Sequence, residues 1–247
     1  MAKLALLSLL FLLAGSEASD SEYRDKVDEL TRQASKALPF FEDPVEVSLS
    51  MSLRSLFDVD TIQNKVSFVV WKKESWDDTG LEWDDEESEV SPVNLKAKSV
   101  WQPDTVSYNL VRREESLAPK EVVVYSSGKV ELSTPLRLTV ECDLGGVETY
   151  SGATCELVIG SWNYDVRRLT LADPTDESFS IKEFSKASKY EVLSYRVKKS
   201  ASYFRSSKKP FDIITFSFAF RLKYGDYSRP PSKREQKRSI RSFFQHK

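Results

Sequence analysis

Two cysteines are the residues in this chain whose chemistry is easiest to read. Cys142 and Cys155 are the only cysteines in the sequence, and twelve residues (143–154) lie between them. Leu136, Leu138 and Val140 precede Cys142 at every second position, and Cys155 opens a second apolar alternation. This pattern predicts two half-buried strands with inward-facing cysteines, joined by a polar loop. A bridge would close a loop of about 15 residues and constrain the unfolded chain by about 3 kcal/mol.

Aromatic residues that break the core alternation are the second group. In the strand expected over Lys65–Lys72, Val66, Phe68 and Val70 share the core parity, so Trp71 faces outward. Trp162 likewise has the parity opposite to Cys155. One such ring is more often ordinary rim packing, but several converging rings would need an interface or ligand to cover them. Ring faces attract cations, and a desolvated amine gains about 2 kcal/mol per good contact.

Catalytic and metal chemistry are not indicated. The single histidine, His246, lies in a charged C-terminal segment, and no nucleophile–base pair or zinc-ligand spacing appears. The acidic run Asp84-Asp85-Glu86-Glu87 could collect calcium, but isolated acidic runs rarely bind it tightly. We therefore expect a binding protein and not an enzyme, with no cofactor, no bound metal and no nucleic-acid partner.

The elements that must position these residues are mostly strands. Ser19 and Glu22 have capping-box spacing, and apolar residues follow at helical intervals up to Pro39, which predicts one short helix. A period of two follows, and a Ser126–Lys129 turn predicts a hairpin. Helices do not alternate with strands, so the sequence predicts an all-β, immunoglobulin-like antiparallel sandwich of about ten strands. The expected strands include 45–54, 65–72, 121–125, 130–133, 136–142, 155–159, 190–197 and 213–222.

The chain divides into three parts. A basic start, an apolar stretch from Leu4 to Ala14 and small residues before a site after Ala18 predict a secretory signal peptide over residues 1–18. Residues 19–227 are expected to form one β domain, and residues 228–247 a basic, mobile tail. No later apolar run approaches the roughly 20 residues of a transmembrane helix. We therefore expect a soluble, secreted, extracellular protein with no transmembrane segment.

The cysteine spacing, followed by Gly160-Ser161-Trp162, resembles the signature loop of the Cys-loop receptor superfamily, and especially its soluble acetylcholine-binding proteins. The resemblance runs from about Glu22 to Lys223. It implies a Cys142–Cys155 disulfide, a ring of five identical subunits and a small-molecule ligand held in an aromatic cage between neighbours. Its other carriers are the tryptophans expected in the core, Trp76 and Trp83, together with Trp101-Gln102-Pro103-Asp104 and Tyr108-Asn109.

The same resemblance implies which residues contact the ligand. Phe211 falls near the place of a fourth aromatic of the principal face, after one extra residue. Glu131 and Ser133 stand where acetylcholine-binding proteins usually present apolar contacts. The expected ligand-binding residues are Tyr108, Trp162, Tyr203, Phe211 and Arg205 on the principal face, and Trp71, Glu131 and Ser133 on the complementary face.

The sequence departs from the resembling family at the lid over the ligand. Agonist-binding members carry adjacent cysteines there, whereas this chain has Phe204-Arg205-Ser206-Ser207-Lys208-Lys209. A basic lid repels a cationic ligand by about 1 kcal/mol per close pair in water, an effect that Glu131 could partly offset. We therefore expect weak acetylcholine and nicotine binding, and better binding of bulkier zwitterionic or amphiphilic amines.

Three other functions stay open at this stage. The pocket could be degenerate, in a structural or interaction protein that uses its basic tail and acidic loop. The chain could be a truncated ectodomain of a neurotransmitter-gated channel, although its loop between the cysteines is polar where channels usually present an apolar tip. Exposed aromatics could also stack sugars in a carbohydrate-binding sandwich.

Overall fold

The computed structural model describes residues 20–40, 42–84, 90–145, 152–204 and 207–223. The expected signal peptide, the C-terminal tail, Arg205 and acidic residues 85–89 lie outside the described residues. A helix covers residues 20–33, and two short 3₁₀ helices cover Ala97–Ser99 (η1) and Asp176–Ser178 (η2). The strands are β1 Val45–Asp60, β2 Lys65–Glu82, β3 Val93–Lys96, β4 Thr105–Ser107, β5 Glu115–Ser116, β6 Glu121–Val124, β7 Ser127–Glu141, β8 Ala153–Ser161, β9 Leu169–Leu171, β10 Phe179–Ser180, β11 Tyr190–Ser202 and β12 Phe211–Leu222.

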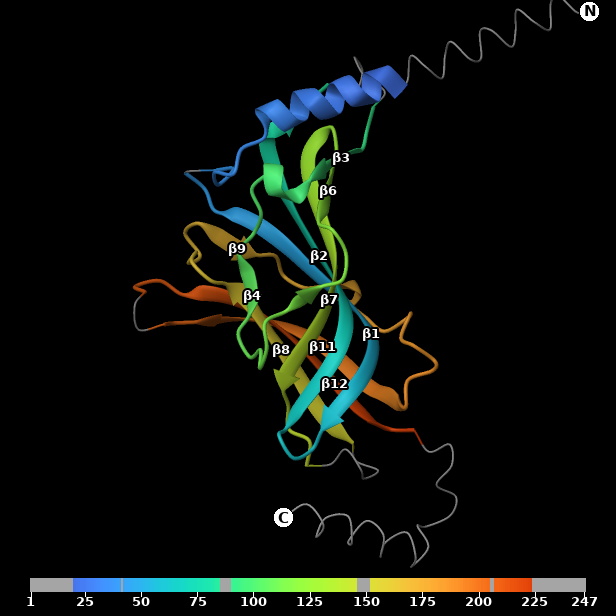
Figure 1. Ribbon diagram of the computed structural model, residues 1–247. Helices are drawn as coiled ribbons and strands as arrows, with labels where there is room; N and C mark the ends of the chain where they lie inside the picture. The colour runs from blue at the N-terminus through green and yellow to red at the C-terminus, as the bar shows by residue number, and fades with distance from the viewer. Residues whose placement is uncertain (1–19, 41, 85–89, 146–151, 205–206, 224–247) are drawn as a thin grey trace, which may run out of the picture.

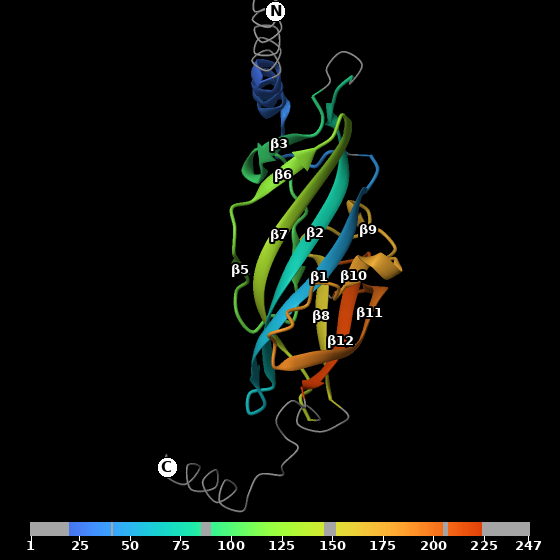
Figure 2. The same cartoon turned by 90° about the vertical axis from the view of Figure 1, so that its right-hand side faces the viewer.

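Two sheets pack face to face, which confirms the predicted sandwich (Figures 1 and 2). The larger sheet has the order β10-β1-β2-β7-β6-β3, with β5 beside β7 and β9 beside β1; the smaller has the order β11-β12-β8-β4. Most pairs are antiparallel, as expected. The short strands β9 and β10 instead run parallel to β1. Both lie in the connection between β8 and β11 of the smaller sheet, and both pair with β1 of the larger sheet.

The predicted helix is present and lies across one end of the sandwich (Figure 1). Leu30 is fully buried against the core, and Val27 packs beside it. The helix ends at residue 33, earlier than the proline at position 39 suggests. The backbone N–H of Ala34 still donates to Leu30 in a last helical turn.

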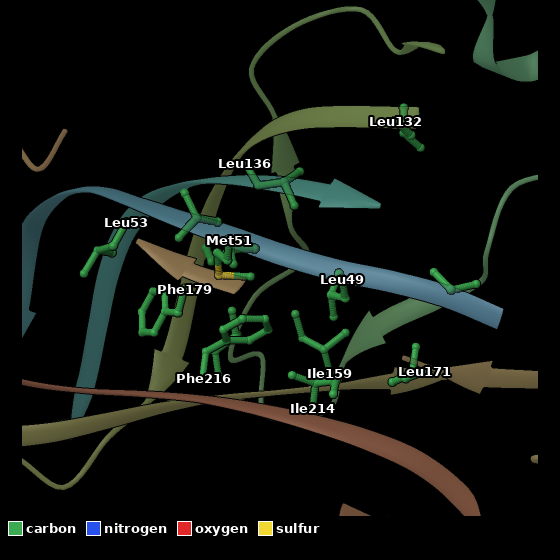
Figure 3. Close-up of a cluster of buried hydrophobic side chains, with 14 of the residues drawn as sticks. Leu49, Met51, Leu53, Leu132, Leu136, Ile159, Leu171, Phe179, Ile214 and Phe216 are labelled. Atoms are coloured by element: carbon green, nitrogen blue, oxygen red, sulfur yellow. The ribbon is translucent and has the colours of Figure 1, made fainter. Parts of the chain in front are cut away.

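The core fills the space between the sheets, as Figure 3 shows for part of it. In β12, Ile214, Phe216, Phe218 and Phe220 are buried, as the alternation predicts. The ring of Phe218 packs edge-to-face on Phe68 of the larger sheet, with centroids 5.4 Å apart. Each fully buried side chain of this kind contributes about 1.5–3 kcal/mol, so this stripe holds the two sheets together.

Strand β2 is longer than the sequence suggests. The sequence predicts a strand over Lys65–Lys72, yet β2 continues to Glu82. Lys72 and Glu74 occupy inward positions and are buried. The Lys72 ammonium lies 3.1 Å from Glu74 and 3.0 Å from the Thr105 hydroxyl of β4, and that hydroxyl also bonds Glu74. Because Lys72 and Glu74 neutralise each other, both can occupy inward positions, and the alternation of β2 continues past them.

Strand β7 is continuous where the sequence suggests two strands, 130–133 and 136–142. Pro135 lies between these two ranges and lacks a ladder donor. The Pro135 carbonyl accepts from Leu117, just beyond β5. The N–H and C=O of a strand residue point to the same neighbour, so the missing donor faces the short β5 side and leaves the β2 pairing intact.

The predicted disulfide is formed between Cys142 and Cys155, whose Cα atoms are 4.8 Å apart. Both cysteines are buried, which confirms their inward parity. Cys142 directly follows β7 of the larger sheet, and Cys155 belongs to β8 of the smaller one. The bridge therefore ties the two sheets covalently.

Candidate ligand-binding site

Trp162 directly follows β8 and projects from the molecule, with 68% of its surface exposed. Its loop is held by Asp104, whose carboxylate accepts from the Ser161 hydroxyl at 2.5 Å, the Asn163 backbone N–H at 2.7 Å and the Asn163 amide at 2.9 Å. The Trp162 N–H donates to the backbone carbonyl of Asp104 at 3.3 Å. Asp104, the last residue of the Trp101–Asp104 motif, therefore fixes the outward position of Trp162.

Tyr108 lies beside the same loop, just after β4. Its hydroxyl donates to the carbonyl of Ser161 at 2.5 Å. Gly160 leaves room for this contact, because a Cβ there would lie 2.6 Å from the Tyr108 hydroxyl. Burial, with the negative charge of Asp104, raises the pKa of Tyr108 above its usual range. The phenol therefore stays protonated and keeps donating at physiological pH.

Tyr108, Phe204 and Phe211 form a group that we call the inner aromatic cluster. Phe204 packs edge-to-face on both partners, with centroids 5.8 Å from Tyr108 and 5.3 Å from Phe211. Phe211 is nearly buried, whereas Tyr203 is 73% exposed. The sequence reasoning placed Phe204 in the lid but not among the ligand contacts. Its position next to Tyr203 indicates that the two rings face opposite ways, but not that Phe204 is the one that faces Tyr108.

Trp71 faces outward from β2 and is 44% exposed, as its parity predicts. The guanidinium carbon of Arg54 lies 3.9 Å from the centroid of its ring, and Arg54 is also paired with Glu183. Trp71 belongs to the larger sheet, whereas the inner aromatic cluster belongs to the smaller one. Among the described residues, no ring contact joins the two groups within one chain.

Glu131 faces outward from β7 within a cluster of charges. It pairs with Lys73 at 2.9 Å and Lys129 at 2.8 Å, and accepts from the Tyr125 hydroxyl at 3.3 Å. Burial raises the pKa of Glu131, but the hydrogen bonds from the two lysines outweigh it and lower the pKa below its usual value. Its charge is thus neutralised within the chain, which leaves little to offset a basic lid. Ser133 is exposed beside it, across from Lys73.

A polar hollow of about 260 Å³ lies next to Glu131, between β1, β2, β7 and the segment 172–178. Serine hydroxyls, Lys73, Lys129 and Asp173 line it, and no aromatic residue does. Such a lining suits the polar end of a ligand and not a desolvated amine.

The tryptophans expected in the core and the two lysines of the lid are also among the described residues. Trp76 and Trp101 are buried and pack edge-to-face 5.7 Å apart, and Trp83 packs half-buried against the core. The family resemblance thus named the core tryptophans correctly. In the basic lid, Lys208 and Lys209 are exposed.

No group of three or more His, Cys, Asp or Glu side chains could hold a metal ion within the ranges that the structure covers. In those same ranges, no helix is long and apolar enough to cross a membrane.

The sequence of this chain is similar to sequences of one protein family. The family model described as neurotransmitter-gated ion-channel ligand binding domain matches residues 24–224. The chain is 26% identical over 224 residues to the acetylcholine receptor subunit alpha-type acr-16 of Caenorhabditis briggsae, which covers 87% of this chain and 44% of that protein. It is 25% identical over 221 residues to acetylcholine receptor subunit alpha-1-A of Xenopus laevis, covering 86% of this chain and 48% of that protein.

A third relative is the neuronal acetylcholine receptor subunit eat-2 of Caenorhabditis briggsae, which is 29% identical over 170 residues, or 65% of this chain and 34% of that protein. The chain spans less than half the length of each of these three relatives.

Proposed function

Because the chain belongs to the family of neurotransmitter-gated ion-channel ligand-binding domains, we propose that it is a secreted, soluble binding protein of the acetylcholine-binding type. It assembles as a homopentamer and binds small amine-bearing or zwitterionic molecules between neighbouring subunits. The leader-like residues 1–18 support secretion. The Cys142–Cys155 disulfide supports an oxidising compartment, where such bonds persist.

The exposed ring of Trp162 is the observation that carries this proposal. A tryptophan held 68% exposed by a dedicated carboxylate is costly unless a partner covers it. Tryptophan is also the best aromatic partner for a cation. In a ring of subunits, the exposed Trp71 of a neighbour would complete the cage from the other side.

The charges around these rings favour a zwitterion over a simple cation. The lid carries exposed Lys208 and Lys209, and Trp71 already holds the guanidinium of Arg54. A compact cation would meet these positive groups. A zwitterion can place its anionic end near the lid or in the polar hollow, and its cationic centre on Trp162.

Tryptophan fluorescence titration tests the proposal with a matched pair of ligands. Benzyltrimethylammonium supplies the cation alone, and benzyldimethyl(3-sulfopropyl)ammonium adds an anionic end to the same centre. We expect the sulfobetaine to bind more tightly, and acetylcholine and nicotine to bind about a hundredfold more weakly than a fully contacted agonist would, the loss of two good contacts.

Trp162→Ala provides the decisive comparison, with Trp71→Ala probing the complementary wall. Loss of sulfobetaine binding in both variants supports an interfacial cage. Submicromolar binding of acetylcholine by the wild type would contradict the ligand preference. Sulfobetaine binding that is unchanged in Trp162→Ala would remove the site itself.

The extracellular part of a channel subunit is the second candidate. It is favoured by the relatives, which are receptor subunits more than twice as long as the matched segment. Expression of the natural gene in cells, followed by separation of medium and membranes, distinguishes the two. Recovery from the medium supports the secreted protein, and recovery only with membranes supports the subunit.

A further inference from the structure

The inner aromatic cluster is filled by side chains of the chain itself. Phe204 contacts Tyr108 and Phe211 edge-to-face, at centroid distances of 5.8 Å and 5.3 Å. Both values lie in the preferred range for aromatic pairs. Phe204 therefore connects the residue that follows β4 with the first residue of β12.

Tyr108 has little freedom to present its ring elsewhere. Its hydroxyl is bonded to the Ser161 carbonyl, and its Cε2 atom lies close against Gly160, 3.0 Å from where a Cβ would stand. A cation must come within about 6 Å of a ring centroid to gain from it. Phe204 already lies at that distance, so a ligand can reach Tyr108 on that side only if Phe204 moves.

The aromatic rings of the expected principal face therefore fall into two groups. Tyr108 and Phe211 are in contact with Phe204, whereas Trp162 and Tyr203 are open to solvent. Phe211 is 9% exposed, whereas Trp162 and Tyr203 are 68% and 73% exposed. We propose that Phe204 is a specificity-determining residue: it occupies the compact part of the aromatic site and so disfavours small quaternary ammonium ions. Larger ligands are left to Trp162 and Tyr203. This inference rests on the proposed ligand-binding function and names the residue that restricts it.

Tetramethylammonium and benzyldimethyl(3-sulfopropyl)ammonium are suitable probes in fluorescence titrations of the full-length protein. Phe204→Ala is expected to raise the tetramethylammonium affinity by about tenfold, because two aromatic contacts no longer have to be broken. The sulfobetaine affinity should change by less than about threefold. Phe204→Leu keeps most of the volume and should remain close to the wild type.

Tyr203→Ala is the matched control, because it removes the neighbouring exposed ring. It should not raise the tetramethylammonium affinity. An equal gain in Tyr203→Ala would overturn the inference, since any loosening of the β11–β12 hairpin would then suffice. An unchanged or lower tetramethylammonium affinity in Phe204→Ala would also overturn it. Thermal unfolding of each variant verifies that it is folded, which is expected because Phe204 is 41% exposed.

The proposed function fails separately from this inference. If the wild type binds no sulfobetaine, the proposed function is lost. If it binds sulfobetaine through Trp162 but Phe204→Ala gains nothing for tetramethylammonium, only the role of Phe204 is lost.

Discussion

Asp104 illustrates how one carboxylate can determine the position of an exposed aromatic ring that it does not touch. Its oxygens accept from Ser161 and from both the backbone and side chain of Asn163, the residues on either side of Trp162. Trp162 itself makes only a backbone contact to this residue. The orientation of the exposed ring therefore depends on its neighbours' hydrogen bonds.

Replacing Asp104 with alanine should release this loop. Three charge-assisted hydrogen bonds are lost, and the buried Ser161 hydroxyl keeps no acceptor there, so we expect a loss of about 2–3 kcal/mol in the free energy of unfolding. Sulfobetaine affinity should fall by at least about tenfold. Urea unfolding and fluorescence titration measure the two effects. Asp28→Asn, at an exposed carboxylate of the helix over residues 20–33, is the control and should change neither.

At the scale of elements, the parity of single strands was predictable, but their lengths were not. Trp71, Cys142, Cys155 and the β12 phenylalanines lie on the faces that alternation predicts. The length of β2 was missed because Lys72 and Glu74 read as surface residues. Only their mutual contact with Thr105, 33 positions beyond Lys72, makes their burial tolerable. Local periodicity contains no information about such a distant partner.

The inner aromatic cluster was missed in part for a similar reason. The parity of Tyr203 and Phe204 tells that they face opposite ways, but not which one faces Tyr108. That choice depends on the packing of the β11–β12 hairpin against β4. The family resemblance supplied Tyr108, Trp162 and Trp71 by position, and the structure adds Phe204, Asp104 and Arg54 through their contacts.

The buried Lys72–Glu74 pair should respond differently to single and double substitution. Lys72→Met leaves the Glu74 carboxylate buried without its cation, and should lower the free energy of unfolding by about 3–5 kcal/mol. Lys72→Met combined with Glu74→Leu removes both charges and should be nearly neutral or stabilising. Glu74→Leu alone completes the cycle, and urea unfolding of all four proteins gives the coupling energy.

The exposed Arg137–Glu115 pair is the control for that experiment, because both side chains are about half exposed. Breaking it should change the free energy of unfolding by less than about 1 kcal/mol. Additive effects at Lys72 and Glu74 would contradict the account of β2 given above.

At the scale of the whole molecule, the outer face of the larger sheet carries several apolar side chains that a single chain leaves uncovered. Phe57 and Trp71 are 50% and 44% exposed on adjacent strands, and Leu117 is 42% exposed beside β5. Large exposed apolar groups of this kind mark protein interfaces. In the proposed ring, a neighbouring subunit covers this face.

Light scattering after size exclusion should therefore give a mass about five times that of one subunit. Phe57→Asp should weaken this assembly, because it places a charge in the covered face. Ile62→Asp is a matched control: this residue is 84% exposed in the β1–β2 turn and should have no effect on the mass. A wild-type protein that stays monomeric at micromolar concentration would remove the ring and, with it, the interfacial site.

Besides apolar packing, two separate links join the two sheets of the sandwich. Cys142–Cys155 joins the end of β7 to β8, and the Lys72–Glu74–Thr105 contacts join β2 to β4. Apolar packing is non-directional, whereas a covalent bond and hydrogen bonds join particular atoms of the two sheets. The disulfide and the polar contacts each hold a strand of one sheet against a strand of the other, β7 with β8 and β2 with β4. The outer part of the β11–β12 hairpin extends from the body in Figure 1 and takes part in neither link, so we expect any displacement on binding of the proposed ligand to occur there.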